Sequence, residues 1–154
     1  MFSESADFYD LIYSIKDYQR EAGLLRDRIR TEHPAGKTIL DIACGTGELH
    51  PYLTDEYEVD GLDINETFLK AARRKHPGGN YFQADMADFD LGKQYDIVTC
   101  LFSSIGYLRN LPELHSALRC FARHLREDGL VIVEPWLTPE AYVPGKLHMV
   151  TYEG

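Results

Sequence analysis

The segment ILDIACGTGE, residues 39–48, gives the clearest indication of the fold. Its first half is apolar and rich in isoleucine, which suits a buried parallel strand, and Gly45 and Gly47 follow in a loop. Two glycines two residues apart let the backbone turn sharply and approach a bound molecule, because no Cβ stands in the way. Asp63 ends the next apolar run, where an acidic side chain is placed to accept hydrogen bonds from ribose hydroxyls. The pattern indicates a nucleoside site, although a G-x-G alone also occurs in tight turns that bind nothing.

The position after these glycines argues against a dinucleotide. Dinucleotide-binding turns carry a third glycine, which allows the helix to pack closely on the strand beneath a pyrophosphate. His50 occupies that position here. We therefore expect a ligand without a pyrophosphate.

The loop resembles motif I of the class I methyltransferases that use S-adenosylmethionine, whose pattern is apolar-x-D-x-x-x-G-x-G. The residues that match this part of the family are Asp41, Ala43, Gly45, Thr46 and Gly47. The resemblance implies that the loop holds the methionine part of the cofactor and that Asp63 holds the ribose. Its neighbour Ile64 is also expected to bind the cofactor. This cofactor has no phosphate, in agreement with a loop that has no basic residues.

Helical and strand-like patterns alternate along the chain. Apolar spacings of three and four, together with breaker residues, predict helices over Asp17–Arg30, Glu66–Lys75 and Pro112–Arg126, the last ended by Gly129. Strand-like runs cover residues 38–42, 57–62, 80–84, 95–101 and 130–134. Repeated strand, helix, strand units imply right-handed crossovers and a parallel sheet. The resemblance specifies a Rossmann-like α/β fold with a mostly parallel sheet in the order 3-2-1-4-5 and helices on both faces.

The resemblance also implies that three residues at the ends of strands bind the cofactor. Asp85 and Met86 follow the third predicted strand, and the resemblance implies that Asp85 meets the adenine amino group while Met86 packs on the ring. An Asp that caps a helix is the alternative for Asp85. Leu101, at the end of the fourth predicted strand, would also contact the cofactor.

The segments that follow the fourth and fifth strands should face the transferred methyl group, because ligands of open α/β sheets lie outside the carboxyl ends of the strands. The first of these segments reads FSSIGYL, and the second, starting from Val133, reads VEPWLTPEAY. With FYDLIY and KDY near the N-terminus, they resemble the N-methyltransferases that act on the amine of nucleotide-linked amino-deoxysugars, of the desosamine and mycaminose type. Motif I is common to the whole class and identifies only the cofactor.

This second resemblance assigns roles to individual residues. Tyr107 would lie near the acceptor amine; a phenol with a reference pKa of about 10 is a poor base, so orienting the amine is its expected role. Tyr9 and Tyr18 would close over the cofactor, or would be core aromatics. The residues expected to line the acceptor site are Ser103, Ser104, Glu134 and Trp136. Glu134 would hold an ammonium, or would only be a polar residue at a strand end.

Composition excludes several classes of protein. The chain has 154 residues and a net charge of −9 with no basic run, which argues against nucleic acid or an anionic membrane as the main partner and favours a small-molecule substrate. Arg109 and Lys146 are candidates to meet the phosphates of a nucleotide-linked sugar. The three cysteines form no C-x-x-C pair and the six histidines show no H-x-x-x-H or H-x-H spacing, so no metal site is predicted, and we expect the histidines to be structural and at the surface or partly buried. Without an apolar run of about 18 residues or a signal peptide, the chain is expected to be cytoplasmic.

The two parts of the chain receive different predictions. Residues 1–135 are expected to form the S-adenosylmethionine-binding domain, and 136–154 the start of a truncated substrate-binding segment. The family's C-terminal strands are absent, so the fifth strand would lie at an exposed edge, to be completed by a homodimer or another partner. Three functions stay open: N-methylation of an amino-sugar nucleotide, methylation of another small molecule, and a non-catalytic cofactor-binding module.

Overall fold

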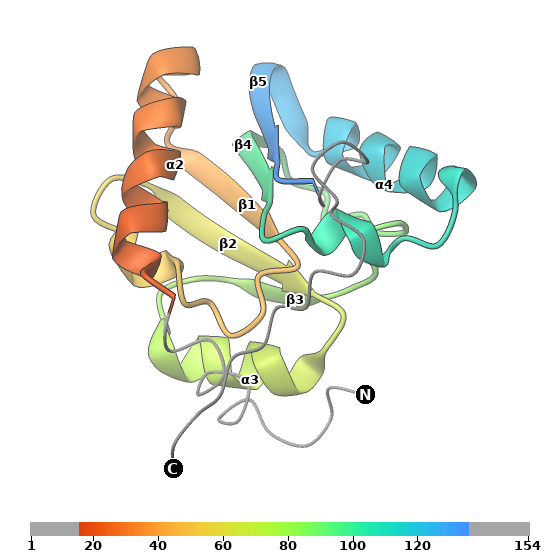
Figure 1. Ribbon diagram of the computed structural model, residues 1–154, viewed down its shortest axis with the longest axis horizontal. Coiled ribbons are helices and arrows are strands. Elements are labelled where there is room, and N and C mark those ends of the chain that lie inside the picture. The colour runs from red at the N-terminus through yellow and green to blue at the C-terminus, as the bar shows by residue number, and fades with distance from the viewer. Residues whose placement is uncertain (1–15, 136–154) are drawn as a thin grey trace, which may run out of the picture.

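Five strands form the centre of the protein, and helices pack on both faces of the sheet (Figure 1). The computed structural model describes residues 16–135. The strands are β1 (Thr38–Ile42), β2 (Glu58–Asp63), β3 (Tyr81–Gln83), β4 (Tyr95–Cys100) and β5 (Leu125–Val133). The helices are α2 (Tyr18–Glu32), α3 (Glu66–Lys75) and α4 (Leu111–Arg123), with the short 3-10 helices η1 (His50–Tyr52) and η2 (Ser104–Tyr107).

The strand order is β3-β2-β1-β4-β5, and every neighbouring pair is parallel, which confirms the predicted topology. Ile42, at the end of β1, pairs with Leu62 on one side and with Cys100 on the other. The strand ends are therefore level, and the loops that leave them lie along one edge of the sheet. This carboxyl edge is where ligands of such sheets bind.

The two faces of the sheet are covered by different helices, because side chains alternate between the faces along each strand. The first face is covered by α2, and its buried residues include Ala22, Leu25, Ile29, Ile39 and Ile97. The second is covered by α4, and its buried residues include Leu40, Val98, Ala117, Cys120 and Phe121. Burial of one large apolar side chain contributes roughly 1.5–3 kcal/mol, so this packing holds both helices on the sheet.

The first two helices begin at capping residues that the sequence supplies. The Asp17 carboxylate accepts a hydrogen bond from the Arg20 N–H at 2.9 Å, and the Asn65 side chain accepts one from the Thr67 N–H at 2.9 Å. Helix α3 has the predicted bounds, and α2 continues to Glu32, beyond its predicted end. Both predictions of a helix are confirmed.

The passage from α4 to β5 differs from the prediction. The helix ends at Arg123, and the strand begins at Leu125 instead of Leu130. The pairing of β5 with β4 is interrupted after Leu125 and resumes at Leu130, so residues 126–129 bulge out of the ladder. Gly129 lies in this bulge, and the prediction that it ends the helix is wrong.

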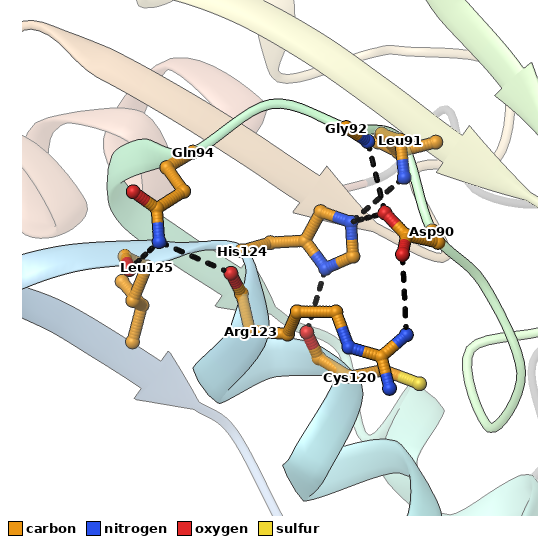
Figure 2. A network of polar contacts seen from close by, with 8 residues as sticks. All are labelled: Asp90, Leu91, Gly92, Gln94, Cys120, Arg123, His124 and Leu125. Atoms are coloured by element: carbon orange, nitrogen blue, oxygen red, sulfur yellow. Dashed lines mark hydrogen bonds and ion pairs between the residues drawn. The ribbon is translucent and has the colours of Figure 1, made fainter.

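His124 is the physical reason for the early end of α4. Its ring is buried, with Nδ1 at 2.7 Å from the Cys120 carbonyl oxygen and Nε2 accepting the Leu91 N–H at 2.9 Å (Figure 2). Because Nε2 accepts, Nδ1 carries the proton and donates to Cys120. The His124 carbonyl accepts the Tyr95 N–H at 2.8 Å, which starts the pairing with β4. The expectation of a surface or partly buried histidine is wrong at this position.

We expect the His124→Leu substitution to lower the free energy of unfolding by about 2 kcal/mol, because it leaves the Leu91 N–H without its buried acceptor. Urea denaturation followed by circular dichroism measures this change. His115→Leu is the matched control, since His115 is an exposed residue of the same helix. Equal stability of the two variants would contradict this role for His124.

The edges of the sheet are β3 and β5. Within residues 16–135 no strand pairs with the outer side of β5. In the same part of the chain, no helix has the length and apolar character needed to cross a bilayer.

Candidate functional site

The loop after β1 crosses the carboxyl edge of the sheet in a left-handed backbone conformation at three positions. Ala43, Gly45 and Gly47 have φ angles of 58°, 57° and 74°. Glycine adopts such angles freely, whereas they cost Ala43 roughly 1 kcal/mol. A Cβ on Gly47 would lie 3.3 Å from the Ala72 Cβ of α3, so the loop is also packed tightly. The backbone turns sharply at the two glycines, as the sequence predicted.

Buried polar side chains support this loop from below. The Thr99 hydroxyl donates to Asp41 Oδ1 at 2.7 Å, and His50 Nε2 lies 3.1 Å from Asp41 Oδ2. The other ring nitrogen, His50 Nδ1, lies 2.9 Å from the Tyr81 hydroxyl oxygen. A carboxylate only accepts hydrogen bonds, so His50 donates from Nε2 and accepts the Tyr81 proton at Nδ1. Burial raises the pKa of Tyr81, which keeps its hydroxyl protonated as a donor.

His50 is therefore a structural residue of the loop. It is 0% exposed, whereas the sequence predicted a surface or partly buried position. Its ring also stacks on the Tyr81 ring, with centroids 5.5 Å apart and an interplanar angle of 13°. His50 occupies the position of the third glycine in dinucleotide-binding turns. Its side chain points inward and connects Asp41 of β1 with Tyr81 of β3.

Asp63 lies at the end of β2, beside the same loop. Its Oδ2 accepts the Gly45 N–H at 2.9 Å and its Oδ1 accepts the Asn65 N–H at 2.8 Å. Burial raises the pKa of the Asp63 carboxyl, and these two backbone hydrogen bonds oppose the rise. A carboxylate has about four acceptor positions, so Asp63 is able to accept further hydrogen bonds from a ligand.

A pocket opens between the loop, the start of α2 and the turn after β4. Several predicted site residues from distant parts of the chain line it together, namely Tyr18, Asp41, Ala43, Gly45, Thr46, Leu101, Ser104 and Tyr107. The structure thus joins the expected cofactor loop to the expected acceptor residue Tyr107. Gly47 and Asp63 lie beside this group, Gly47 within the loop and Asp63 in hydrogen-bond contact with Gly45.

Five further residues that were not predicted from the sequence also line this pocket, namely Lys16, Cys44, Glu48, Leu49 and Phe102. Lys16 and Phe102 belong to the KDY and FSSIGY segments, so a signal was present in the sequence. The Lys16 ammonium lies 3.0 Å from the centroid of the Phe102 ring, and the Tyr18 ring meets Phe102 edge-on with centroids 6.0 Å apart. These contacts close the pocket where α2 meets the end of β4.

The turn after β4 is held to the end of β5. Phe102 and Ser103 have positive φ angles of 54° and 60°, which are uncommon for residues with a Cβ. Glu134 Oε2 accepts the Phe102 N–H at 2.8 Å, and the Ser103 hydroxyl donates to the Pro135 carbonyl at 3.2 Å. Glu134 lines a neighbouring groove, and neither Glu134 nor Ser103 is among the residues that line the pocket. This contact fits the alternative that Glu134 is a polar residue with a structural role at a strand end.

Tyr107 and Arg109 both lie at the surface near the pocket. Tyr107 is 70% exposed and ends η2, so it is accessible to a substrate. The Arg109 guanidinium is paired with Glu113 in the first turn of α4, with Arg109 Nη2 at 2.9 Å from Glu113 Oε1. A phosphate at Arg109 would have to compete with this carboxylate.

The predicted adenine residues lie at the end of β3. Asp85 is exposed, and its side chain accepts the Ala87 N–H at 2.8 Å in a turn that is closed by bridge pairing with Asp88. No helix begins at this turn within the described chain, so the alternative that Asp85 caps a helix is wrong. Met86 follows in the turn, and Ile64, next to Asp63, is 67% exposed. The predicted roles of Tyr9, Trp136 and Lys146 lie outside the described residues.

Comparison with known proteins identifies a common family. A family model described as "Methyltransferase domain" matches residues 39–129. The chain is 43% identical over 153 residues to the dTDP-3-amino-3,6-dideoxy-alpha-D-glucopyranose N,N-dimethyltransferase of Streptomyces fradiae, covering 97% of this chain and 60% of that one. It is 41% identical to the dTDP-3-amino-3,4,6-trideoxy-alpha-D-glucopyranose N,N-dimethyltransferase of Streptomyces venezuelae, over 92% of this chain and 61% of that one.

Solved structures give the same result. The sugar N-methyltransferase KedS8 of Streptoalloteichus aligns over 100% of this chain and 62% of its own, with a TM-score of 0.91 and 35% identity. The crystal structure of Streptomyces venezuelae DesVI aligns over 92% of this chain and 61% of its own, with a TM-score of 0.86 and 42% identity. The chain thus spans about three fifths of the length of these relatives. It belongs to the methyltransferase domain family, whose Rossmann-like fold it shares.

Proposed function

We propose that this chain binds S-adenosylmethionine at the carboxyl edge of its sheet and takes part in methylating the amine of a nucleotide-linked amino-deoxysugar. The observation that carries the proposal is the loop of residues 43–47, where Gly45 donates its N–H to Asp63 and lines a pocket together with Tyr107. This loop therefore connects the proposed ribose-binding carboxylate with the proposed position of the acceptor. The similarity to amino-sugar N,N-dimethyltransferases supports the nature of the acceptor.

The residues at this edge fit the chemistry of the cofactor. The two ribose hydroxyls are hydrogen-bond donors, and Asp63 offers them a partly desolvated carboxylate. Asp85, exposed at the end of β3, would accept a hydrogen bond from the adenine amino group, and the apolar side chains of Ile64 and Met86 would contact the cofactor. The loop of residues 43–47 has no basic residue, as suits a ligand without phosphate.

The proposed chemistry depends on alignment. Bound S-adenosylmethionine supplies a methyl group that is already activated by the positive sulfur. Protein side chains therefore need only orient the acceptor amine and exclude competing water, and proximity supplies most of the acceleration. The amine has to be neutral when it attacks, since an alkylammonium, which titrates near pKa 10, has no lone pair. In this proposal the hydroxyl of Tyr107, which lines the pocket, orients the amine.

A transfer assay with methyl-labelled S-adenosylmethionine tests the proposal. Acceptors would include a dTDP-3-amino-3,6-dideoxyhexose, the same sugar nucleotide with a hydroxyl in place of the amine, and a simple alkylamine, with products detected by mass spectrometry. We expect methylation of the amino-sugar nucleotide alone, on nitrogen. Transfer only to other acceptors would favour a different small-molecule methyltransferase. Cofactor binding without transfer to any of them would favour a non-catalytic binding module.

The Tyr107→Phe substitution tests the orienting role in the same assay. We expect kcat to fall about three- to tenfold, because an orienting hydrogen bond contributes less than a general base would. The affinity for S-adenosylhomocysteine, measured by calorimetry, should stay the same. A loss of more than about a thousandfold in kcat would instead assign proton transfer to Tyr107.

A further inference from the structure

Lys16 is the only basic residue among the described residues that line the pocket. Its ammonium lies on the face of the Phe102 ring, 3.0 Å from the centroid, and 5.9 Å from the centroid of Tyr18. Burial lowers the pKa of Lys16, and the nearby Glu134 carboxylate opposes this shift. A partly desolvated ammonium at this position would gain from a second anion.

The order of the strands indicates which part of the cofactor would reach Lys16. Under the proposed function, Asp85 after β3 meets the adenine and Asp63 after β2 meets the ribose. The next strands along the sheet are β1 and then β4. The methionine part therefore extends over the loop after β1 toward the turn after β4. In this turn the Lys16 ammonium packs on the ring of Phe102. The far end of this part bears an α-carboxylate and an α-ammonium.

We propose that Lys16 binds the α-carboxylate of S-adenosylmethionine and so orients the methionine part of the cofactor. This inference rests on the proposed function, because it takes the ligand to be this cofactor. The Phe102 ring fixes the ammonium from one side, and the aromatic pair of Tyr18 and Phe102 holds that ring in place. Lys16 is thus a specificity residue, which distinguishes cofactors that carry an amino-acid carboxylate from nucleosides that lack one.

Ligands that lack parts of the methionine group test this contact without any transfer reaction. Calorimetric titration would compare S-adenosylhomocysteine with S-adenosyl-3-thiopropylamine, which lacks only the carboxylate, and with 5′-methylthioadenosine, which lacks the whole amino-acid group. We expect Lys16→Met to weaken binding of S-adenosylhomocysteine about 10- to 30-fold, as for the loss of one hydrogen bond to a charged group. Binding of the other two ligands should be unchanged. Lys16→Arg should keep most of the affinity, because a guanidinium also pairs with a carboxylate.

The controls separate this contact from other causes. Lys37→Met removes the same charge from an exposed lysine just before β1, at the opposite end of the sheet, and should leave all three affinities unchanged. A parallel loss for all three ligands in Lys16→Met would assign Lys16 a purely structural role and overturn the inference. Equal affinity of wild type and Lys16→Met for S-adenosylhomocysteine would also overturn it. Failure of the wild type to bind S-adenosylhomocysteine would instead reject the proposed function itself.

Discussion

The Asp63→Ala substitution is expected to weaken binding of S-adenosylhomocysteine by about 150-fold or more. The substitution removes the proposed acceptor for the two ribose hydroxyls, and hydrogen bonds to a charged group contribute about 1.5–3 kcal/mol each. It also releases the Gly45 N–H, which Asp63 holds at 2.9 Å, so the loop loses one of its fixed points. Isothermal titration calorimetry measures the affinity, and a thermal melt records the stability of the variant.

Asp55→Ala is the matched control for this experiment. Asp55 is an exposed residue in the turn before β2, at the opposite end of that strand, and its removal changes the net charge by the same amount. We expect its affinity for S-adenosylhomocysteine to equal that of the wild type. A folded Asp63→Ala variant that binds as tightly as the wild type would show that the ribose site is assigned wrongly.

The Asp41→Ala substitution is expected to lower the free energy of unfolding by about 3 kcal/mol. The buried Asp41 carboxylate accepts from the Thr99 hydroxyl at 2.7 Å and pairs with His50 at 3.1 Å. Alanine leaves the Thr99 hydroxyl and the His50 Nε2–H buried without their acceptor, and each unsatisfied group costs about 1–3 kcal/mol. Urea denaturation followed by circular dichroism measures the loss.

Thr99→Val provides the comparison on the same buried contact. It removes the donor to Asp41 and keeps the shape of the side chain, so it should cost less, about 1 kcal/mol. The pairing of Asp41 with His50 is left intact in this variant. If Asp41→Ala were no less stable than Thr99→Val, the His50 contact would contribute nothing to the support of the loop.

The sheet and the loop after β1 could be predicted because their signals are local. The apolar runs, the two glycines and Asp63 lie close together in the sequence. Each of them predicts a local feature of the backbone, namely a strand, a sharp turn or the end of a strand. The resemblance of motif I added the strand order, which periodicity alone does not give. Helix α3 matched its predicted bounds because Pro77 and two glycines follow its end.

The end of α4 could not be predicted because it depends on a tertiary contact. Its helical pattern continues to Leu125, and Gly129 is the next strong stop signal in the sequence. The structure ends the helix earlier because the ring of His124 accepts a hydrogen bond from Leu91, in the segment between β3 and β4. The spacing of apolar residues along a helix contains no information about a hydrogen-bond partner that lies 33 residues away in the sequence.

The same limit applies to the pocket. Lys16 and Phe102 were in segments recognised by resemblance, but their contact joins the start of α2 to the turn after β4. His50 was noticed only because it is not a glycine, and its inward orientation follows from hydrogen-bond partners on β1 and β3. The residue types thus predicted which side chains belong to the site. The contacts between these side chains depend on the packing of segments that are distant in the sequence.

The ligand selectivity of the 154-residue chain tests directly whether the loop of residues 43–47 binds S-adenosylmethionine. Isothermal titration calorimetry would compare S-adenosylhomocysteine with NAD⁺, since both are adenosine ligands but only NAD⁺ carries a pyrophosphate. We predict saturable one-to-one binding of S-adenosylhomocysteine and no measurable heat with NAD⁺. Binding of NAD⁺ in preference to S-adenosylhomocysteine would contradict the assignment of the loop at residues 43–47.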